Sequence, residues 1–267
     1  MSSSKSAAII IAAHKEAEMP QGEYYLPLHV GCEGRNDLGF TGDNTGDNIS
    51  LRNSFYSELT GLYWAWKNLN CEYLGLAHYR RHFSIKGFLF RKTHKPMECV
   101  LTDDELESLL DPETIIVPTR RNYYIETIAS HYNNSMYDGE TQLNAVHSVL
   151  SGKYPGYVPA FDEVMQKTSA HMFNMFVAPK RLANEYCRWL FDVLAEVETH
   201  VDSSKYSDFD KRYPGRLSEI LFNVWLIHNG IKTKTIGRID LWRVNWPKKI
   251  TLFLAAKAFG HKQTKSS

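Results

Sequence analysis

Four consecutive side chains that can bind an anion, His78, Tyr79, Arg80 and Arg81, follow an apolar stretch in the sequence YLGLAHYRRHF. Guanidinium groups are costly to bury without a partner, and their forked shape matches phosphate oxygens. The pattern indicates either a site for a phosphate-bearing ligand, such as a nucleotide diphosphate, or a solvated strand end paired with nearby carboxylates. The residues alone weigh these two interpretations about equally.

Other polar residues lie beside apolar stretches in the same way. His14 and Lys15 follow the apolar run 7–13, and Asn174 lies inside HMFNMF. In open α/β sheets, ligands bind at the carboxyl ends of strands, so we expect such residues to converge. Glu219 lies near the start of a predicted helix, where a carboxylate stabilises the helix dipole by about 0.3–1 kcal/mol. The alternative role is a general base for a substrate hydroxyl, worth roughly 10²–10⁴-fold in rate.

The loop GDNTGDN offers oxygen atoms that could bind a metal ion. Asp43 and Asp47 lie four residues apart, and Asn48 follows them. Carboxylates and amides suit a hard cation, but Asp and Asn side chains in such loops commonly bond their own backbone. We favour the turn over the metal site, and a contact between this loop and a nucleotide is compatible with both. Neither a GxGxxG nor a GxxxxGK[ST] pattern occurs.

Composition excludes several classes of protein. The chain has 267 residues, with 31 basic and 30 acidic side chains, and this balance argues against a general nucleic-acid binder. The 15 Tyr and 6 Trp residues suit stacking on sugars and bases, and they are also common in cores. Four widely spaced cysteines without a CxxC pair predict reduced thiols in a cytoplasmic protein. No apolar stretch reaches the roughly 18 residues of a membrane span.

Strand and helix patterns alternate along the chain, which predicts an α/β fold with a mainly parallel sheet. Expected strands include 7–13, 28–31, 115–118, 171–178 and 232–239, and expected helices include 53–69, 181–201 and 217–228. We expect a disordered leader over 1–6, one domain over 7–239 and an extension over 240–267. That extension mixes Trp, Leu and Phe with Lys and Arg, so it predicts either a segment at a membrane surface or a docked helix.

An ordered set of motifs resembles a bacterial family of capsular and exopolysaccharide glycosyltransferases, long catalogued only as a domain of unknown function. The resemblance spans roughly residues 8 to 230. It is carried by AAHKEAEMP, YYLPLHVG, GDNTGDNIS, YSELTGLYWAWKN, YLGLAHYRRHF, FNMFV, YCRWLFDVL and GRLSEILFNVWL. It implies a GT-A-like single domain that transfers a sugar from a UDP-sugar to a growing capsular, exopolysaccharide or O-antigen glycan. Galactose, in pyranose or furanose form, is the implied sugar, and the implied displacement is inverting.

GT-A enzymes usually hold a divalent metal ion, Mn²⁺ or Mg²⁺, with an Asp-x-Asp motif after a middle strand. This chain has His78, Tyr79 and Arg80 at the position where that motif is expected. Arg80 and Arg81 are therefore expected to stabilise the leaving diphosphate in place of, or beside, a metal ion.

The resemblance also suggests roles for the donor-side residues. His14 and Lys15 would hold the uridine or its phosphates, together with His78 and Tyr79. The loop containing Asp43, Asp47 and Asn48 would complete the nucleotide pocket with Glu58.

The acceptor side is expected to involve Asn174 and the segment 123–132, which contains His131 and Tyr132. Glu219 is the expected catalytic base. The rivals for that role are Glu58, Asp138, Asp208 and Asp210.

Two alternatives from other classes remain open at this point. A nucleotide-sugar hydrolase would need the same donor site but no glycan acceptor, and a non-catalytic glycan- or nucleotide-binding module would bind without turnover. The apolar and basic extension over 240–267 favours the transferase, because a lipid-linked acceptor would lie at the inner face of the cytoplasmic membrane.

Overall fold

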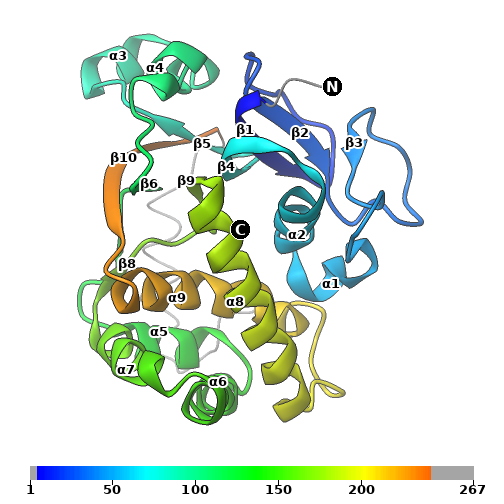
Figure 1. Cartoon of the computed structure of the whole chain (residues 1–267), viewed down its shortest axis with the longest axis vertical. Coiled ribbons are helices and arrows are strands. Elements are labelled where there is room, and N and C mark those ends of the chain that lie inside the picture. Colours follow the sequence, from blue (N-terminus) through cyan, green and yellow to red (C-terminus); the bar gives the residue numbers. More distant parts are fainter. Residues whose placement is uncertain (1–4, 242–267) are drawn as a thin grey trace, which may run out of the picture.

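A computed structural model describes residues 5–241, which form a central eight-stranded sheet flanked by helices (Figure 1). The strand order in this sheet is β3-β2-β1-β4-β5-β10-β6-β9, and β7 and β8 form a separate pair. The strands are β1 (Lys5–Ala13), β2 (Tyr25–His29), β3 (Thr41–Gly42), β4 (Cys71–His78), β5 (Arg81–Ser84), β6 (Thr114–Pro118), β7 (Arg121–Asn122), β8 (Ser169–Ala170), β9 (Phe176–Pro179) and β10 (Lys232–Asp240).

Helices connect most of these strands. The α-helices are α1 (Asn53–Tyr56), α2 (Leu59–Asn68), α3 (Phe88–Thr93), α4 (Asp103–Glu107), α5 (Ile128–Ser135), α6 (Gly139–Lys153), α7 (Val158–Gln166), α8 (Lys180–His200) and α9 (Tyr213–His228). Short 3-10 helices cover Ser50–Arg52, Met97–Cys99, Pro155–Tyr157 and Asp210–Arg212. No helix within residues 5–241 is both long and apolar enough to cross a membrane.

The sheet is mixed, and the prediction of a mainly parallel sheet is wrong. Strands β1, β2, β3 and β4 run parallel, but β5 and β9 both pair antiparallel with β4. Only Tyr79 and Arg80 separate β4 from β5, and His78 pairs with Arg81. Because a parallel connection needs a crossover of a dozen or more residues, this short turn forces the chain to reverse.

The two faces of the sheet build two cores, as the alternation of strand side chains requires. In β1, Ile10 faces the core that includes residues of α2 and α8, and Ile9 faces the core that includes Leu106 of α4. Helix α2 packs closely because Gly61 has no side chain: a Cβ there would lie 2.7 Å from Cγ1 of Val30. Helix α4 begins at a capping box formed by Thr102 and Glu105.

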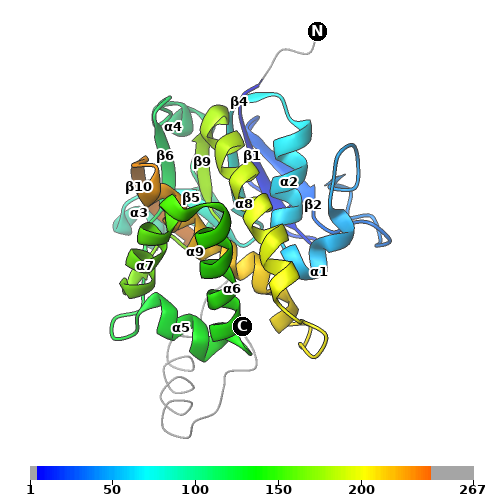
Figure 2. The same ribbon diagram turned by 60° about the horizontal axis from the view of Figure 1, so that its bottom comes forward.

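A group of helices completes the fold below the sheet, as Figures 1 and 2 show. Helix α9 contacts α7 and α8, and α6 contacts α5, α7 and α8. These helices build a single large core with one face of the sheet. The start of α9, which carries Glu219, also contacts α1.

Several element boundaries differ from the expected ones. Strand β1 begins at Lys5, within the expected leader, and the expected strand 171–178 is a strand only from Phe176. The expected helix 53–69 is broken at Ser57, whose φ of +50° is unfavourable for a residue with a side chain. Residues 1–4 of the expected leader and residues 242–267 of the extension expected over 240–267 lie outside the described part of the chain.

Candidate active site

A cavity of about 310 Å³, here called the first cavity, opens at the carboxyl ends of β1, β2 and β4. The parallel pairing of these strands brings His14 and His78 to the same edge of the sheet, as expected. The cavity is lined by Ala12, His14, Val30, Arg35, Asn53, Ser54, Ser57, Glu58, His78, Arg80, Asp208, Lys211 and Arg212.

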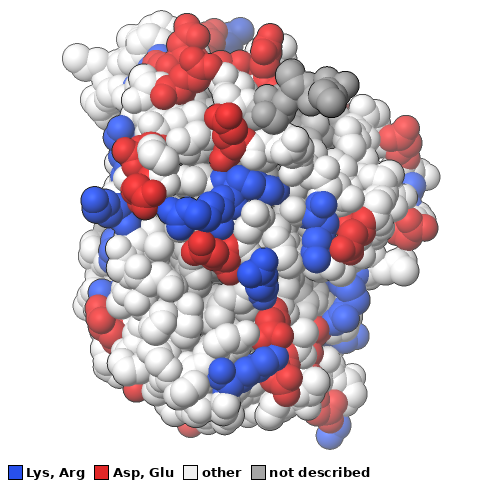
Figure 3. All heavy atoms as spheres, in the orientation of Figure 1, with Lys and Arg blue, Asp and Glu red and all other residues white. Residues whose placement is uncertain are grey.

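Positive charge dominates the first cavity. Four cationic side chains line it, against the two carboxylates of Glu58 and Asp208. Burial lowers the pKa of His14, and the charges of Lys15, Arg212, Arg80 and Arg35 lower this pKa further. In the view of Figure 3, Lys and Arg side chains form a band across the middle of the molecule. An excess of cations around a hollow favours an anionic ligand.

The turn between β4 and β5 supplies one wall of the cavity. Burial, followed by the charges of Arg80 and Arg81, lowers the pKa of His78 to about 2, so this imidazole is neutral. Its Nδ1 accepts a hydrogen bond from the Arg80 amide at 3.4 Å. Tyr79 is buried, and its ring packs 4.4 Å from the ring of His78 and 5.2 Å from that of His14, between centroids. Tyr79 therefore supports the two histidines from beneath.

Arg80 and Arg81 diverge from this turn. Arg80 lines the first cavity, whereas Arg81 is fixed by its Nε, which donates to Oδ1 of Asp240 at 3.2 Å. The guanidinium groups of Arg81 and Arg238 lie 4.7 and 4.2 Å from the ring centroid of Phe173. Burial and the charge of Arg80 lower the pKa of Arg81, and the negative charge of Glu219 opposes this lowering. Arg80 and Arg81 thus lie in neighbouring regions and do not both line the first cavity.

The helix break at Ser57 brings Glu58 to the cavity. Glu58 is the N-cap residue of α2, and its Oε1 accepts a hydrogen bond from Nδ2 of Asn174 at 2.8 Å. The same Nδ2 donates to the carbonyl of Gly215 at 3.0 Å, and Oγ of Ser218 donates to Oδ1 of Asn174 at 2.8 Å. Asn174 is buried, and its side-chain amide is engaged in these bonds.

Backbone strain marks the segment that carries Asn174. Phe173 and Asn174 have φ values of +80° and +51°, the left-handed region that disfavours residues with side chains. Such conformations cost of order 1–3 kcal/mol each and persist where the surroundings impose them. Here the bonds to Glu58 and Gly215 and the two guanidinium groups on Phe173 hold the segment.

Glu219 lies in the first half of α9 with properties suited to proton transfer. Burial and the neighbouring charge of Glu58 raise its pKa to about 7, although Arg121, Arg216 and Arg81 act in the opposite direction. A carboxylate with a pKa near neutrality can accept a proton and release it again. Glu219 is not among the residues that line the first cavity. Glu58 does line the cavity, and its negative charge raises the pKa of Glu219.

The loop 42–48 is bonded to the protein itself. Asp43 is fully buried, and its carboxylate accepts hydrogen bonds from the amides of Gly31 and Cys32 and from the hydroxyls of Ser50 and Thr60. This satisfies both oxygens, which favours the turn interpretation over a nucleotide or metal contact by Asp43. Among the described residues, no group of three or more His, Cys, Asp or Glu side chains is arranged to hold a metal ion.

The rest of that loop is also tied down. Asp47 accepts from the hydroxyl of Tyr63 at 3.1 Å and lies 3.5 Å from Nζ of Lys67. Asn48 bonds the backbone of Gly46 and Ser50. Asp47 and Asn48, expected in the nucleotide pocket, lie outside the lining of the first cavity.

The two expected acceptor residues, His131 and Tyr132, differ in exposure. His131 is partly exposed, its Nδ1 lies 3.0 Å from Oε2 of Glu126, and its ring packs 4.1 Å from that of Tyr123. Tyr132 is a core residue whose hydroxyl donates to Gln142 at 2.6 Å, so it does not offer a surface to an acceptor. Tyr123 and Glu219 interact electrostatically, which places the segment before α5 beside the expected base.

Residues that sequence reasoning missed complete the first cavity. Arg35 comes from the loop after β2, Asn53 from α1, and Lys211 and Arg212 from the short helix before α9. The pair Lys211–Arg212 directly before a helix start was the one available signal. Among the rival bases, Glu58 and Asp208 line the cavity. Asp138 instead bonds Thr141 and Tyr206, and Asp210 bonds Ser207 and the amide of Tyr137.

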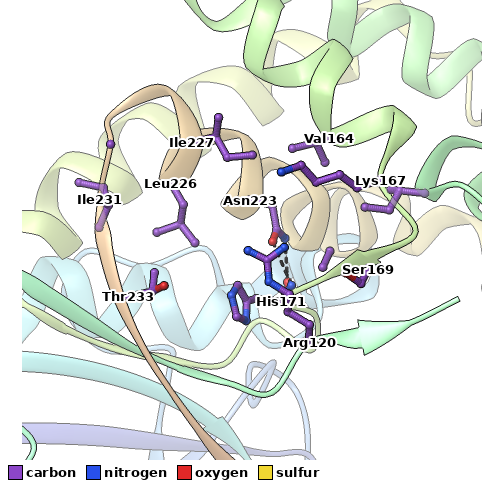
Figure 4. Close-up of a pocket in the computed structure, with 13 residues that line it drawn as sticks. Arg120, Val164, Lys167, Ser169, His171, Asn223, Leu226, Ile227, Ile231 and Thr233 are labelled. Atoms are coloured by element: carbon purple, nitrogen blue, oxygen red, sulfur yellow. Dashed lines mark hydrogen bonds between the residues drawn. The ribbon is translucent and has the colours of Figure 1, made fainter. Parts of the chain in front are cut away.

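A second cavity, of about 240 Å³, lies between α7, α9 and β8 (Figure 4). Its polar groups are bonded to each other: the Asn223 side chain binds the amide and carbonyl of His171, and Nδ1 of His171 bonds the carbonyl of Pro118. The second cavity is lined by Arg120, Ile128, Val164, Lys167, Ser169, Ala170, His171, Asn223, Leu226, Ile227, Gly230, Ile231 and Thr233.

Comparison with solved structures finds a glycosyltransferase of similar fold. The chain is similar to the apo structure of the WbbM bifunctional glycosyltransferase, with a TM-score of 0.80 and 27% sequence identity. The match covers 90% of this chain but 46% of that one, so the chain spans about half the length of its relative. A comparison with curated proteins finds no match.

The sequence also matches a family model described as "Domain of unknown function (DUF4422)" over residues 8–230. This range contains most of β1, every element from β2 to α9 and the whole lining of the first cavity. The chain therefore belongs to the DUF4422 family.

Proposed function

We propose that the protein transfers a sugar from a UDP-sugar, with galactose as the expected sugar, to a growing capsular, exopolysaccharide or O-antigen glycan. The observation that carries this proposal is the cation-rich first cavity at the carboxyl edge of a sheet shared with a glycosyltransferase. A nucleoside diphosphate is an anion that needs fixed positive charge, and this cavity offers four cationic side chains.

In this proposal Arg80 is the main partner of the leaving diphosphate. It lines the cavity beside His14 and His78, and Arg35, Lys211 and Arg212 add charge from the opposite loops. As the bond to the anomeric carbon breaks, negative charge builds on the diphosphate. Cations already fixed at that place stabilise the transition state more than the ground state.

Glu219 is the proposed catalytic base. The acceptor hydroxyl oxygen attacks the anomeric carbon, its proton passes to the Glu219 carboxylate, and the bond to the diphosphate breaks with release of UDP. A single displacement of this kind inverts the anomeric centre. The pKa near 7 supports the role, because a base of that strength is ready to act at neutral pH. Asn174 positions Glu58, whose charge helps set this pKa.

We propose that the cations of the first cavity take the place of a divalent ion. The cations of the first cavity can supply the charge that Mn²⁺ or Mg²⁺ supplies elsewhere, and the described residues there include only two carboxylates, Glu58 and Asp208. We therefore propose that donor binding persists when divalent ions are chelated.

Calorimetric titration with UDP, UDP-galactose and UDP-glucose, each with Mn²⁺ and with EDTA, tests the donor site. Micromolar binding that survives EDTA is the expected result, and the absence of binding under both conditions would overturn the proposal. Product analysis with and without a glycan acceptor then tests the reaction. Acceptor-dependent product supports a transferase, whereas sugar release to water alone would indicate a hydrolase and binding without turnover a non-catalytic module.

A further inference from the structure

The short helix α3 carries a group of apolar side chains that the described protein leaves uncovered. The exposed fractions are 78% for Phe88, 77% for Leu89 and 44% for Ile85, and these three residues are called the apolar patch below. Figure 1 shows α3 at an outer corner of the molecule, beside α4 and beyond the end of β5. Soluble proteins rarely leave adjacent large apolar side chains this exposed unless they contact a partner or a membrane.

The charges around the apolar patch identify the kind of partner. The segment 85–95, IKGFLFRKTHK, contains four Lys and Arg residues and no Asp or Glu. Lys86 pairs with Glu105, and Arg91 donates to the carbonyls of Ser84 and Arg238. Lys92 and Lys95 are exposed, and the amide of Lys95 donates to Oε2 of the exposed Glu98 at 3.2 Å, so two outward cations stand against this one carboxylate.

Three of the four acidic residues of the neighbouring helix α4 have partners within the protein, and the fourth, Asp104, is exposed. Asp103 accepts a hydrogen bond from the amide of Glu23 at 2.6 Å, Glu105 pairs with Lys86, and Glu107 accepts from the hydroxyl of Tyr24. Their charge is therefore partly offset within the protein. Apolar tips flanked by lysines are the combination that binds the boundary between headgroups and acyl chains of an anionic bilayer.

We propose that α3 docks the protein on an anionic membrane surface, with Phe88 and Leu89 inserted among the lipid headgroups and Lys92 and Lys95 on the phosphates. A second protein copy would have to present acidic groups around an apolar hollow to match this surface. A bilayer of anionic lipids meets the same requirement without any specific shape.

Helix α3 is close to the first cavity along the chain, so docking through α3 would bring the cavity near the membrane surface. Strand β5 runs from Arg81, next to the first cavity, to Ser84, and the apolar patch begins at the next residue. At about 3.3 Å per residue, the patch lies on the order of 10–20 Å of chain from the site. A glycan on a lipid carrier would then start near the site. This part rests on the proposed function, whereas membrane binding itself does not.

Vesicle co-sedimentation of the full chain tests the docking. The probes are vesicles of phosphatidylcholine with phosphatidylglycerol and vesicles of phosphatidylcholine alone. We expect binding to the anionic vesicles, a loss of about tenfold or more in partition coefficient for Phe88→Ser/Leu89→Ser, and a smaller loss that depends on salt for Lys92→Glu/Lys95→Glu. Leu51→Ser, at a side chain that is 80% exposed elsewhere, is the matched control and should bind like wild type.

Three results would overturn the proposal: no binding of the wild type to anionic vesicles, equal binding by the wild type and Phe88→Ser/Leu89→Ser, or a wild-type dimer that this double variant dissociates. Thermal melts establish that the variants are folded, and the lysine variant remains informative if the apolar one is not. UDP binding in the absence of vesicles is measured on the same proteins, so a failure of the donor site is distinguished from a failure of docking.

Discussion

The two cavities of the molecule are similar in volume but differ in how their polar groups are satisfied. In the second cavity, Asn223 and His171 bond each other and the backbone, and Lys167 pairs with Glu163 at 2.7 Å. In the first cavity, four cationic side chains lie beside two histidines, and burial together with the charge of Arg80 lowers the pKa of both His14 and His78. Neither the volume nor the balance of cations and carboxylates separates the two linings, so the gathering of four cations around neutral histidines is the better indicator of a ligand site.

The largest expected effect is on turnover. Glu219→Gln keeps the shape of the side chain but removes the proposed base, so turnover with saturating donor should fall by roughly 10²–10⁴-fold. Glu163→Gln makes the same change beside the second cavity and should leave the rate within about twofold. Initial-rate assays of the two variants decide the point, and a near-normal rate for Glu219→Gln would assign the base to Glu58 or Asp208.

The next largest expected effect is on donor affinity, which should change for a substitution in the first cavity but not for one in the second. Arg80→Ala removes charge-assisted bonds to the diphosphate, each worth about 1.5–3 kcal/mol, so the Kd for UDP should rise by roughly 10–100-fold. Arg120→Ala, the matched change in the second cavity, should leave this Kd unchanged. Calorimetry measures both values. Equal Kd values for the two variants would show that the first cavity does not hold the diphosphate.

Two buried asparagines allow a comparison of stability with activity. Asn174→Ala and Asn223→Ala each break bonds to buried backbone groups, and each should lower the free energy of unfolding by about 1–3 kcal/mol. Only Asn174→Ala should also lower turnover, because only Asn174 binds Glu58. Urea unfolding and rate assays test the pair, and similar losses of turnover in both variants would contradict the assignment.

The smallest expected effect is a dependence of stability on pH. The pKa of Glu219 is raised from 4.5 to about 7, so the folded state binds more protons than the unfolded state between these values. The free energy of unfolding contributed by this group therefore falls as pH rises from 4.5 to 7. Glu219→Gln removes the ionisation that causes this loss, so the variant should be more stable than wild type at pH 8 and differ little from it at pH 4. Urea titrations at several pH values measure it, and a gain independent of pH would contradict the cause.

The sequence predicted the parts of the site that follow from local patterns. The apolar runs of β1 and β4 and the polar residues after them were recognisable, and parallel pairing then brings His14 and His78 together. The break before Glu58 was not predictable, because Ser57 with a φ of +50° has no glycine to signal it. Arg35 joins the cavity through tertiary packing of a loop, which no local pattern records, whereas Arg212 was signalled only by the Lys211–Arg212 pair before a helix start.

The loop 42–48 has a sequence that does not by itself separate a turn from a ligand site, and the reason is physical. Asp43 looks like a ligand residue in the sequence, but its four hydrogen-bond donors come from segments that are distant along the chain. A carboxylate that organises a loop and one that binds a cation have the same sequence signature. Only the positions of the donors distinguish them.

The two-residue turn between β4 and β5 also limits how this chain can vary in length. The pairing places Arg81 opposite both His78 and Asp240, so one inserted residue in this turn would break that register and displace Arg80 from the first cavity. Loops elsewhere on the surface tolerate insertions and deletions. We therefore expect related sequences to keep this turn at constant length, even where the loops around it grow or shrink.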